Sequence, residues 1–169
     1  MRVIKPFMAS QNAAPKPCEG NPGFVLAGFP SIGKTYLADH PELWPGYGVV
    51  DLDLSHYSAL ECCQIAKEDY LSNAIVLVSA NKEMRDELVK NNVHFALVYP
   101  PRAAKDEWIE RVGSSTDLVN FIQQHWDAMI DSCSQQSNCT KFVIPKGVYL
   151  SHMINDLAKR MNRAGHPNI

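Results

Sequence analysis

The chain has 169 residues, of which 46% are hydrophobic and 20% are charged, a composition that is typical of a globular protein and excludes a disordered or fibrous one. Its formal net charge of -2 gives no overall field that would hold the protein on nucleic acid, although a local basic groove would not show in this total. The length predicts one compact α/β domain.

The cysteines and the N-terminus favour a cytoplasmic protein. The five cysteines are an odd number, and the adjacent Cys62 and Cys63 do not suit a simple disulfide framework, so we expect free thiols. The first residues lack the apolar core of a signal peptide, and no later run reaches the length of a membrane span. We therefore expect no membrane segment.

In chain order, residues 1–22 are expected to form a loose N-terminal arm, because residues 9–22 are rich in Pro, Ala, Asn, Gly and Ser. Residues 23–169 then form the domain. Short apolar runs predict buried strands, and helical periodicity predicts the segments between them. This alternation implies a mostly parallel, three-layer α/β fold. The expected strands are 24–28, 49–53, 75–79, 95–99 and 141–144, and the expected helices are 34–39, 82–91, 103–112, 116–132 and 151–163.

One motif indicates nucleotide binding. The segment GFPSIGKT, residues 28–35, fits the pattern GxxxxGK[ST] between a predicted strand and a predicted helix. Its glycines let the backbone N–H groups surround phosphates, Lys34 reaches the β- and γ-phosphates, and the Thr35 hydroxyl joins the coordination of Mg²⁺. The alternative is a glycine-rich turn with a surface lysine. The cofactors predicted are ATP and Mg²⁺, and the binding residues are Gly28, Ser31, Ile32, Gly33, Lys34, Thr35 and Tyr36.

Two acids follow the second predicted strand. Asp51 and Asp53 alternate along the strand, so both carboxylates are expected on one side, at the carboxyl edge where ligands bind in open α/β sheets. We expect Asp51 to hold the metal and Asp53 to orient or deprotonate the acceptor hydroxyl. The alternative is that both acids cap the next loop or helix.

These residues resemble the nucleoside monophosphate kinase and shikimate kinase group of P-loop kinases, and residues 28–35 are the strongest link. The DLD at 51–53 is similar to the DxD of the shikimate-type branch. Residues 49–58 and 75–112 are similar to small phage and bacterial kinases described as adenylate kinase-like or as 5-hydroxymethyluracil DNA kinases, and the similarity extends over 23 to about 160. The resemblance implies the P-loop NTPase fold, a five-stranded parallel sheet of order 2-3-1-4-5, and a small mobile lid.

The resemblance also implies roles for four basic residues. Arg85 would bind the acceptor and act in catalysis with Lys34 and Asp53, and the lid would carry Arg102, Lys105 and Arg111. From the residues alone, these basic side chains are equally well explained as solvated groups on exposed helix faces. Arg102 and Lys105 share one face of the predicted helix, and Arg111 lies on a different one. The sequence also departs from the family, because Ser79-Ala80-Asn81 stands where many P-loop proteins place a metal-linked aspartate.

The function expected is an ATP-dependent kinase that transfers the γ-phosphoryl group to a hydroxyl- or phosphate-bearing, nucleotide-like acceptor. The acceptor is either a free nucleotide or a modified base in DNA. Two alternatives stay open, which are a small-metabolite kinase of the shikimate or gluconate type and an ATP-binding module that transfers no phosphate. The residues indicate neither the acceptor nor the oligomeric state.

Overall fold

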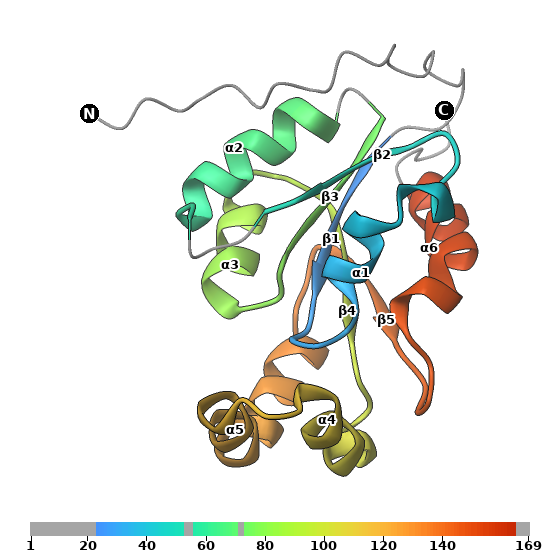
Figure 1. Ribbon diagram of the computed structural model, residues 1–169. Coiled ribbons are helices and arrows are strands. Elements are labelled where there is room, and N and C mark those ends of the chain that lie inside the picture. The colour runs from blue at the N-terminus through green and yellow to red at the C-terminus, as the bar shows by residue number, and fades with distance from the viewer. Residues whose placement is uncertain (1–22, 53–55, 71–72, 165–169) are drawn as a thin grey trace.

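The chain folds around one five-stranded sheet in which all strands run parallel, in the order β2-β3-β1-β4-β5 (Figure 1). The structure is a computed structural model that describes residues 23–52, 56–70 and 73–164. The predicted arm, residues 1–22, and Asp53 lie outside these ranges. The sheet confirms the predicted α/β class and the strand order that the resemblance implies. The strands are β1 (Phe24–Gly28), β2 (Gly48–Asp51), β3 (Ala74–Ser79), β4 (Phe95–Tyr99) and β5 (Cys139–Val143).

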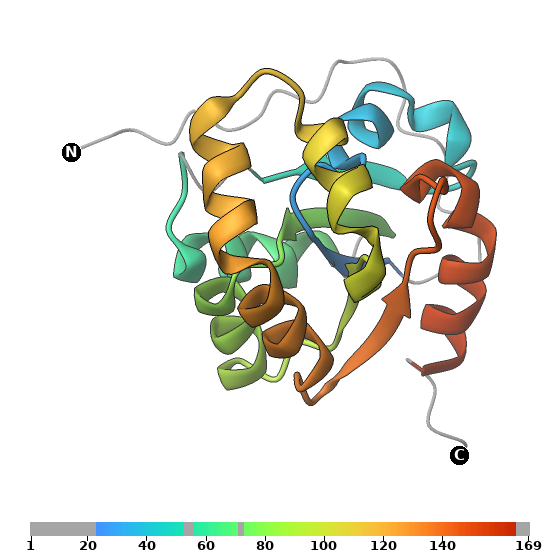
Figure 2. The ribbon, with the colours of Figure 1, turned by 90° about the horizontal axis from the view of Figure 1, so that it is seen from below.

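Helices cover both faces of the sheet. In Figure 1, α2 and α3 pack together on one face, α1 and α6 pack on the other, and α4 and α5 lie at the carboxyl ends of the strands. Figure 2 looks at that end and shows α4 and α5 side by side. Within the described ranges, no helix is both long and apolar enough to cross a membrane. The helices are α1 (Lys34–Asp39), α2 (Ala59–Tyr70), α3 (Lys82–Lys90), α4 (Lys105–Val112), α5 (Thr116–Ser134) and α6 (Leu150–Ala164), with short 3-10 turns η1 (Pro41–Leu43) and η2 (Arg102–Ala104).

The three central strands are buried on both faces, as their apolar sequences predict. All residues of β1 and β4 are buried, and so are those of β3 up to Val78. The edge strands β2 and β5 are partly exposed. Because parallel strands end at a common edge, the loops that follow Gly28, Ser79 and Tyr99 meet there.

The helix α2 is absent from the sequence prediction, although the sequence holds a signal for it. The Ser58 backbone N–H donates to Glu61 Oε2 at 2.8 Å, and the Glu61 N–H donates to the Ser58 hydroxyl at 3.2 Å. This pair is a capping box, whose S-x-x-E spacing marks a helix start. The apolar stripe of α2 is weak because its buried face consists of small side chains, Ala59, Cys62, Cys63 and Ala66. The side chains of Cys62 and Cys63 are buried, and neither forms a disulfide among the described residues.

Several element boundaries differ from the prediction. The strand expected over 49–53 ends at Asp51, and the strand expected over 141–144 begins at Cys139, which pairs with Phe95 of β4. Cys139 and Thr140 do not belong to an apolar run, so the hydrophobic pattern of the sequence does not indicate that β5 begins at Cys139. The helix expected over 103–112 begins as the 3-10 turn η2 and becomes α-helical at Lys105.

We expect Gly23→Ala to destabilise the fold far more than Gly48→Ala. A Cβ at position 23 would come within 2.1 Å of the Ala74 carbonyl oxygen, whereas a Cβ at position 48 would meet the Ala74 Cβ at an ordinary 3.9 Å. Overpacking of this kind costs about 1–3 kcal/mol, and here the obstacle is backbone. Thermal unfolding should therefore show the Gly23→Ala protein melting several degrees lower. Equal melting temperatures for the two variants would contradict this packing.

Candidate functional site

The segment between β1 and α1, residues 28–35, is anchored to both strands that flank β1. We call it the glycine loop. The Gly28 carbonyl accepts a hydrogen bond from the Ala80 N–H at 3.1 Å, just beyond the end of β3. The Phe29 N–H donates to the Val98 carbonyl of β4 at 3.0 Å. The sheet therefore fixes where the glycine loop begins.

The glycine loop folds tightly over the end of β1. A Cβ on Gly28 would lie 2.9 Å from Ile32 Cγ2, so the fold of the loop requires glycine there. The Pro30 carbonyl accepts a hydrogen bond from the Trp108 indole N–H of α4 at 2.7 Å, and the Ile32 carbonyl accepts one from the Leu150 N–H of α6 at 3.3 Å. Helices from both sides thus hold the loop in place.

Two residues of the glycine loop have left-handed backbone angles, with φ of 62° at Ser31 and 110° at Gly33. Tight turns with such residues direct successive N–H groups into a concavity that binds anions. Among the described residues, no carbonyl accepts a hydrogen bond from the N–H groups of Ser31, Gly33, Lys34 or Thr35. The loop therefore presents several backbone donors that a bound anion would satisfy.

The Lys34 side chain folds back along the glycine loop. Its Nζ donates to the Gly28 carbonyl at 2.7 Å. Burial lowers the pKa of Lys34 from 10.5 to about 8, and the Asp51 carboxylate opposes this shift. At neutral pH the amine is therefore protonated but holds its proton weakly for a lysine. An anion beside it would raise the pKa again.

Two adjoining cavities open beside the glycine loop. The first, which we call the loop cavity, measures about 290 Å³, and the second, the side cavity, measures about 310 Å³. They share Gly33, Tyr36 and Tyr149, and the side cavity continues to Ser151 and His152 at the start of α6. Among the described residues, no carboxylate lines either cavity. The loop cavity is lined by Ser31, Ile32, Gly33, Lys34, Thr35, Tyr36, Arg111 and Tyr149.

Arg111 reaches the loop cavity from α4. Its guanidinium lies between the rings of Trp108, at 4.1 Å, and Tyr149, at 4.0 Å. Its Nη2 donates to Glu107 Oε1 at 2.6 Å and to the Val148 carbonyl at 2.8 Å. The side chain is only 5% exposed, yet its Nε and Nη1 have no acceptor among the described residues. Buried donors without acceptors are unfavourable, so this guanidinium is suited to gain a ligand.

Glu107 holds Arg111 in this position. Its Oε1 also accepts a hydrogen bond from the Gly147 N–H at 2.9 Å. This hydrogen bond, together with the Arg111 guanidinium, holds the pKa of Glu107 below its ordinary value. Sequence reasoning missed Glu107 and Tyr149. The spacing of Glu107 and Arg111, four residues apart on one helix, could have predicted their pairing, but nothing in the sequence places Tyr149 beside them.

Thr35 and Asp51 are the two residues that the sequence predicts as oxygen ligands for Mg²⁺. Thr35 lines the loop cavity, and Asp51, at the end of β2, lies near enough to Lys34 for its charge to raise the lysine pKa. Mg²⁺ accepts hydroxyl and carboxylate oxygens and completes its shell with phosphate oxygens and water. The described residues contain no cluster of three or more His, Cys, Asp or Glu that could hold a metal. Asp53, predicted to act on the acceptor, is outside the described residues.

The three predicted lid residues take different positions. Arg111 lines the loop cavity. Arg102 instead pairs with Asp127 at 2.6 Å and with Asp131, both on α5. Lys105 is half-buried at the start of α4. The structure thus brings one of the three to the glycine loop and holds another against α5.

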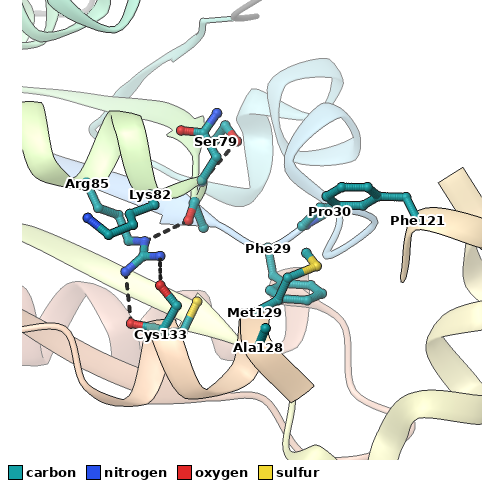
Figure 3. Close-up of a pocket in the computed structure, with 12 residues that line it drawn as sticks. Phe29, Pro30, Ser79, Lys82, Arg85, Phe121, Ala128, Met129 and Cys133 are labelled. Carbon is teal, nitrogen blue, oxygen red and sulfur yellow. Dashed lines mark hydrogen bonds between the residues drawn. The ribbon is translucent and has the colours of Figure 1, made fainter. Parts of the chain in front are cut away.

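Arg85 lies at the end of a third cavity, of about 300 Å³, which we call the α3–α5 cavity (Figure 3). Its side chain is buried and makes four hydrogen bonds. It donates to the Ala80 carbonyl at 2.8 Å, to the Ser132 carbonyl and hydroxyl at 2.9 and 2.6 Å, and to Gln136 Oε1 at 2.6 Å. Arg85 therefore ties the end of β3 to α5, and its role toward an acceptor stays a prediction.

Comparison with known proteins adds no assignment to this geometry. No protein-family model matches the chain, and no curated protein matches it. The resemblance to nucleoside monophosphate kinases and shikimate kinases therefore stays a prediction carried by the residues of the glycine loop and the acids after β2.

Proposed function

We propose that the protein is an ATP-dependent phosphotransferase with the P-loop NTPase fold, which binds the triphosphate of ATP on the glycine loop. The loop cavity carries this proposal. It combines backbone N–H groups that have no carbonyl partner with the cations Lys34 and Arg111, and no carboxylate among the described residues lines it. Positive groups that converge on a concave backbone suit a polyphosphate.

Each element of the site has a place in this function. The N–H groups of the glycine loop and Lys34 bind the β- and γ-phosphates, and the Arg111 guanidinium, which lines the same cavity, adds positive charge beside the phosphate chain. The side cavity lies next to them and suits the nucleoside, because the rings of Tyr36 and Tyr149 offer apolar faces to a base. Together the two adjoining cavities accommodate a nucleotide with its phosphates toward the loop.

The donor set also fits Mg²⁺. Thr35 and Asp51 would hold the ion, which when bound neutralises charge on the phosphates during transfer. Lys34 stabilises the negative charge that develops around the terminal phosphate, and the loop N–H groups fix its position. The proposed acceptor is nucleotide-like, either free or part of DNA, and Asp53 is the proposed residue that orients its hydroxyl.

One observation favours a second candidate, an ATP-binding module without transfer. The strand β3 ends at Ser79 and is followed by Ala80 and Asn81, so this segment supplies no carboxylate beside the glycine loop. Its backbone serves the loop instead, because the Ala80 N–H donates to Gly28. Asp51 is then the one carboxylate among the described residues that is proposed to bind the metal. A site with one carboxylate binds Mg²⁺ chiefly through the phosphates of the bound nucleotide.

Transfer of label from ATP distinguishes the two candidates. The pure protein would be incubated with Mg²⁺ and γ-labelled ATP against nucleosides, nucleotides, small hydroxylated metabolites and base-modified DNA. Label in an acceptor, lost in the Lys34→Ala protein, is the expected result. Binding of ATP without label in any acceptor would favour the module, and absence of ATP binding would contradict both candidates.

The pKa of Lys34 makes ATP binding depend on pH. With a pKa of about 8 in the free protein, Lys34 loses its proton as the pH rises through 8, whereas phosphate oxygens beside it raise the pKa in the complex. Affinity should therefore be highest below pH 8 and fall above it, and binding at pH 9 should take up close to one proton. Calorimetric titration in two buffers of different ionisation enthalpy measures this uptake. Lys34→Arg, which stays protonated, should show none, and equal uptake in both proteins would contradict the assignment.

A further inference from the structure

We propose that the α3–α5 cavity is a second ligand site, which binds a small organic anion, that is, a carboxylate or phosphate group carried by an apolar ring. This inference goes beyond the proposed function and does not rest on it, because the site needs no nucleotide. The cavity measures about 300 Å³, which is room for a small ring compound. One end of the cavity is positively charged and the other is apolar, and these two ends determine the chemistry of the ligand.

The buried charge of Arg85, which lines the cavity, has no acidic partner. Arg85 is 3% exposed, and its four hydrogen bonds go to neutral groups, which are the carbonyls of Ala80 and Ser132, the Ser132 hydroxyl and the Gln136 amide oxygen. None of the ion pairs among the described residues includes Arg85. Because a buried charge without a counterion is unfavourable, an anion near Arg85 would be stabilised.

The end of α5 compensates the charge of Arg85 only in part. Ser132 lies in the last turn of α5, which ends at Ser134. The carbonyl groups at the C-terminus of a helix together carry about half an elementary negative charge. Arg85 therefore fastens α5 to the end of β3 and still leaves positive charge at the wall of the cavity.

The start of α3 adds hydrogen-bond donors to the cavity. Asn81 caps α3, because its side-chain oxygen accepts from the Met84 N–H at 2.8 Å, and its NH₂ group remains a donor. The Ser79 hydroxyl oxygen accepts from the Asn81 N–H at 3.2 Å, so its own O–H also remains to donate. Among the described residues, the backbone N–H groups of Lys82 and Glu83 in the first turn have no acceptor. Donors of this kind at a helix N-terminus favour an anion.

No carboxylate of the described residues lines the cavity and opposes an anion there. The charged residues of the lining are Arg85 and Lys82, both cations. Lys82 pairs with Asp86, and because both side chains are largely exposed, at 72% and 56%, this pair adds little to the net charge. Glu83, in the first turn of α3, is exposed and does not line the cavity. The charged end of the cavity is therefore positive.

The rest of the cavity suits an apolar ring. Figure 3 shows the Phe29 ring and the Met129 thioether between Arg85 on one side and Phe121 on the other. Phe29 is buried, whereas Phe121 is 49% exposed, so a ligand would cover apolar surface of Phe121. Aromatic and thioether groups bind flat apolar bodies well. A ring placed between Phe121 and Met129 would direct its anionic group toward Arg85 and the start of α3.

The glycine loop separates this site from the proposed nucleotide site. Phe29 and Pro30 line the α3–α5 cavity, whereas residues 31–36 line the loop cavity. No described residue lines both cavities. The anion is therefore proposed as a separate ligand and not as the acceptor of the phosphoryl group, and both sites can be occupied at once.

The test measures binding to the full chain without ATP. Protein resonances are followed by NMR while benzoate and phenyl phosphate are titrated as anions that carry a ring. Benzyl alcohol and benzylamine supply the same ring without charge and with a positive charge, and inorganic phosphate supplies an anion without a ring. The titrations with the two ring-bearing anions are repeated with Mg²⁺ and a non-hydrolysable ATP analogue, which would fill the nucleotide site.

Two pairs of variants test the positive charge. Arg85→Gln removes the charge of the guanidinium, and Arg85→Lys keeps a positive charge. Ala128→Glu adds a carboxylate to the cavity wall at an exposed position of α5, and Ala128→Gln is its neutral counterpart of similar size. Arg85 also fastens α5, so thermal melts establish whether its variants are folded. The Ala128 pair decides the question if they are not.

Benzoate, phenyl phosphate or both should bind at least about tenfold more tightly than benzyl alcohol and benzylamine, and should shift resonances of Phe121 and Met129 with or without the ATP analogue. The tighter of the two anions identifies the ligand as a carboxylate or a phosphate ester. Arg85→Gln and Ala128→Glu should each weaken this binding about tenfold, and their counterparts should keep it.

Three results would overturn the inference. These are equal binding of the alcohol and the anions, no ring-bearing anion bound at millimolar concentration, and displacement of the anion by the ATP analogue. Inorganic phosphate that binds as tightly as phenyl phosphate would contradict the role of the apolar wall. Shifts of glycine-loop residues report on the ATP analogue separately, so failure of the proposed function is distinguished from failure of this site.

Discussion

Replacing Lys34 by methionine is expected to lower phosphoryl transfer by about 10²–10³-fold while the fold stays intact, because a cation that stabilises developing charge contributes that much to the rate. Methionine has similar length and no charge. Burial holds the pKa of Lys34 at about 8, below its 10.5 in the unfolded chain, so the protonated amine opposes folding at pH 7, and this cost fades as the pH rises from 8 to 10.5. The melting temperature of Lys34→Met at pH 7 should therefore equal or exceed that of the unaltered protein.

The matched control is Lys90→Met, which removes a 76% exposed lysine at the end of α3. Initial rates of transfer and thermal melts would be measured for all three proteins. The control should transfer phosphate at the normal rate. Loss of activity in Lys34→Met together with a lower melting temperature would show that Lys34 supports the fold, and would contradict a role confined to phosphate binding and transfer.

Replacing Arg111 by methionine is expected to weaken ATP binding about 100-fold, because truncating a buried charge that pairs with its ligand has an effect of that order. The same change should destabilise the free protein by about 3 kcal/mol, since it leaves the Glu107 carboxylate without its cation. Calorimetric titration and chemical unfolding measure the two effects independently.

Variants of Glu107 separate binding from stability. The double variant Glu107→Gln, Arg111→Met should regain much of the lost stability, because no unpaired half-buried carboxylate remains, but it should not regain ATP affinity. Glu107→Gln alone should bind ATP at least as tightly as the unaltered protein, since Arg111 then has no competing carboxylate. If the double variant binds ATP normally, Arg111 does not contact the nucleotide.

Local signals predicted most of the fold. The runs FVLAG at 24–28 and FALVY at 95–99 predicted two strands with the bounds that the structure shows, because strands buried on both faces are continuous apolar segments. The start of β5 and the helix α2 were not predicted, because their residues are polar or small and give a weak hydrophobic pattern. The order of the strands came from the resemblance, since strand periodicity does not say which strands are neighbours.

The residues of the candidate site likewise include some that a local sequence pattern predicted and some that it did not. The motif over 28–35 marked the glycine loop because consecutive residues build it. Arg111 meets Tyr149 only through packing of α4 against the segment before α6, a contact between residues 38 positions apart that no local pattern encodes. The same holds for Arg85, whose partner Ser132 on α5 follows 47 residues later.

The central claim, that the glycine loop binds a triphosphate, is tested most directly by calorimetric titration of the pure protein with Mg²⁺ and ATP, and separately with AMP. Because the loop N–H groups, Lys34 and Arg111 are proposed to contact the phosphate chain, ATP should bind at least about 100-fold more tightly than AMP, and Lys34→Met should remove most of that difference. Equal affinity for ATP and AMP, or no binding of ATP, would contradict the claim.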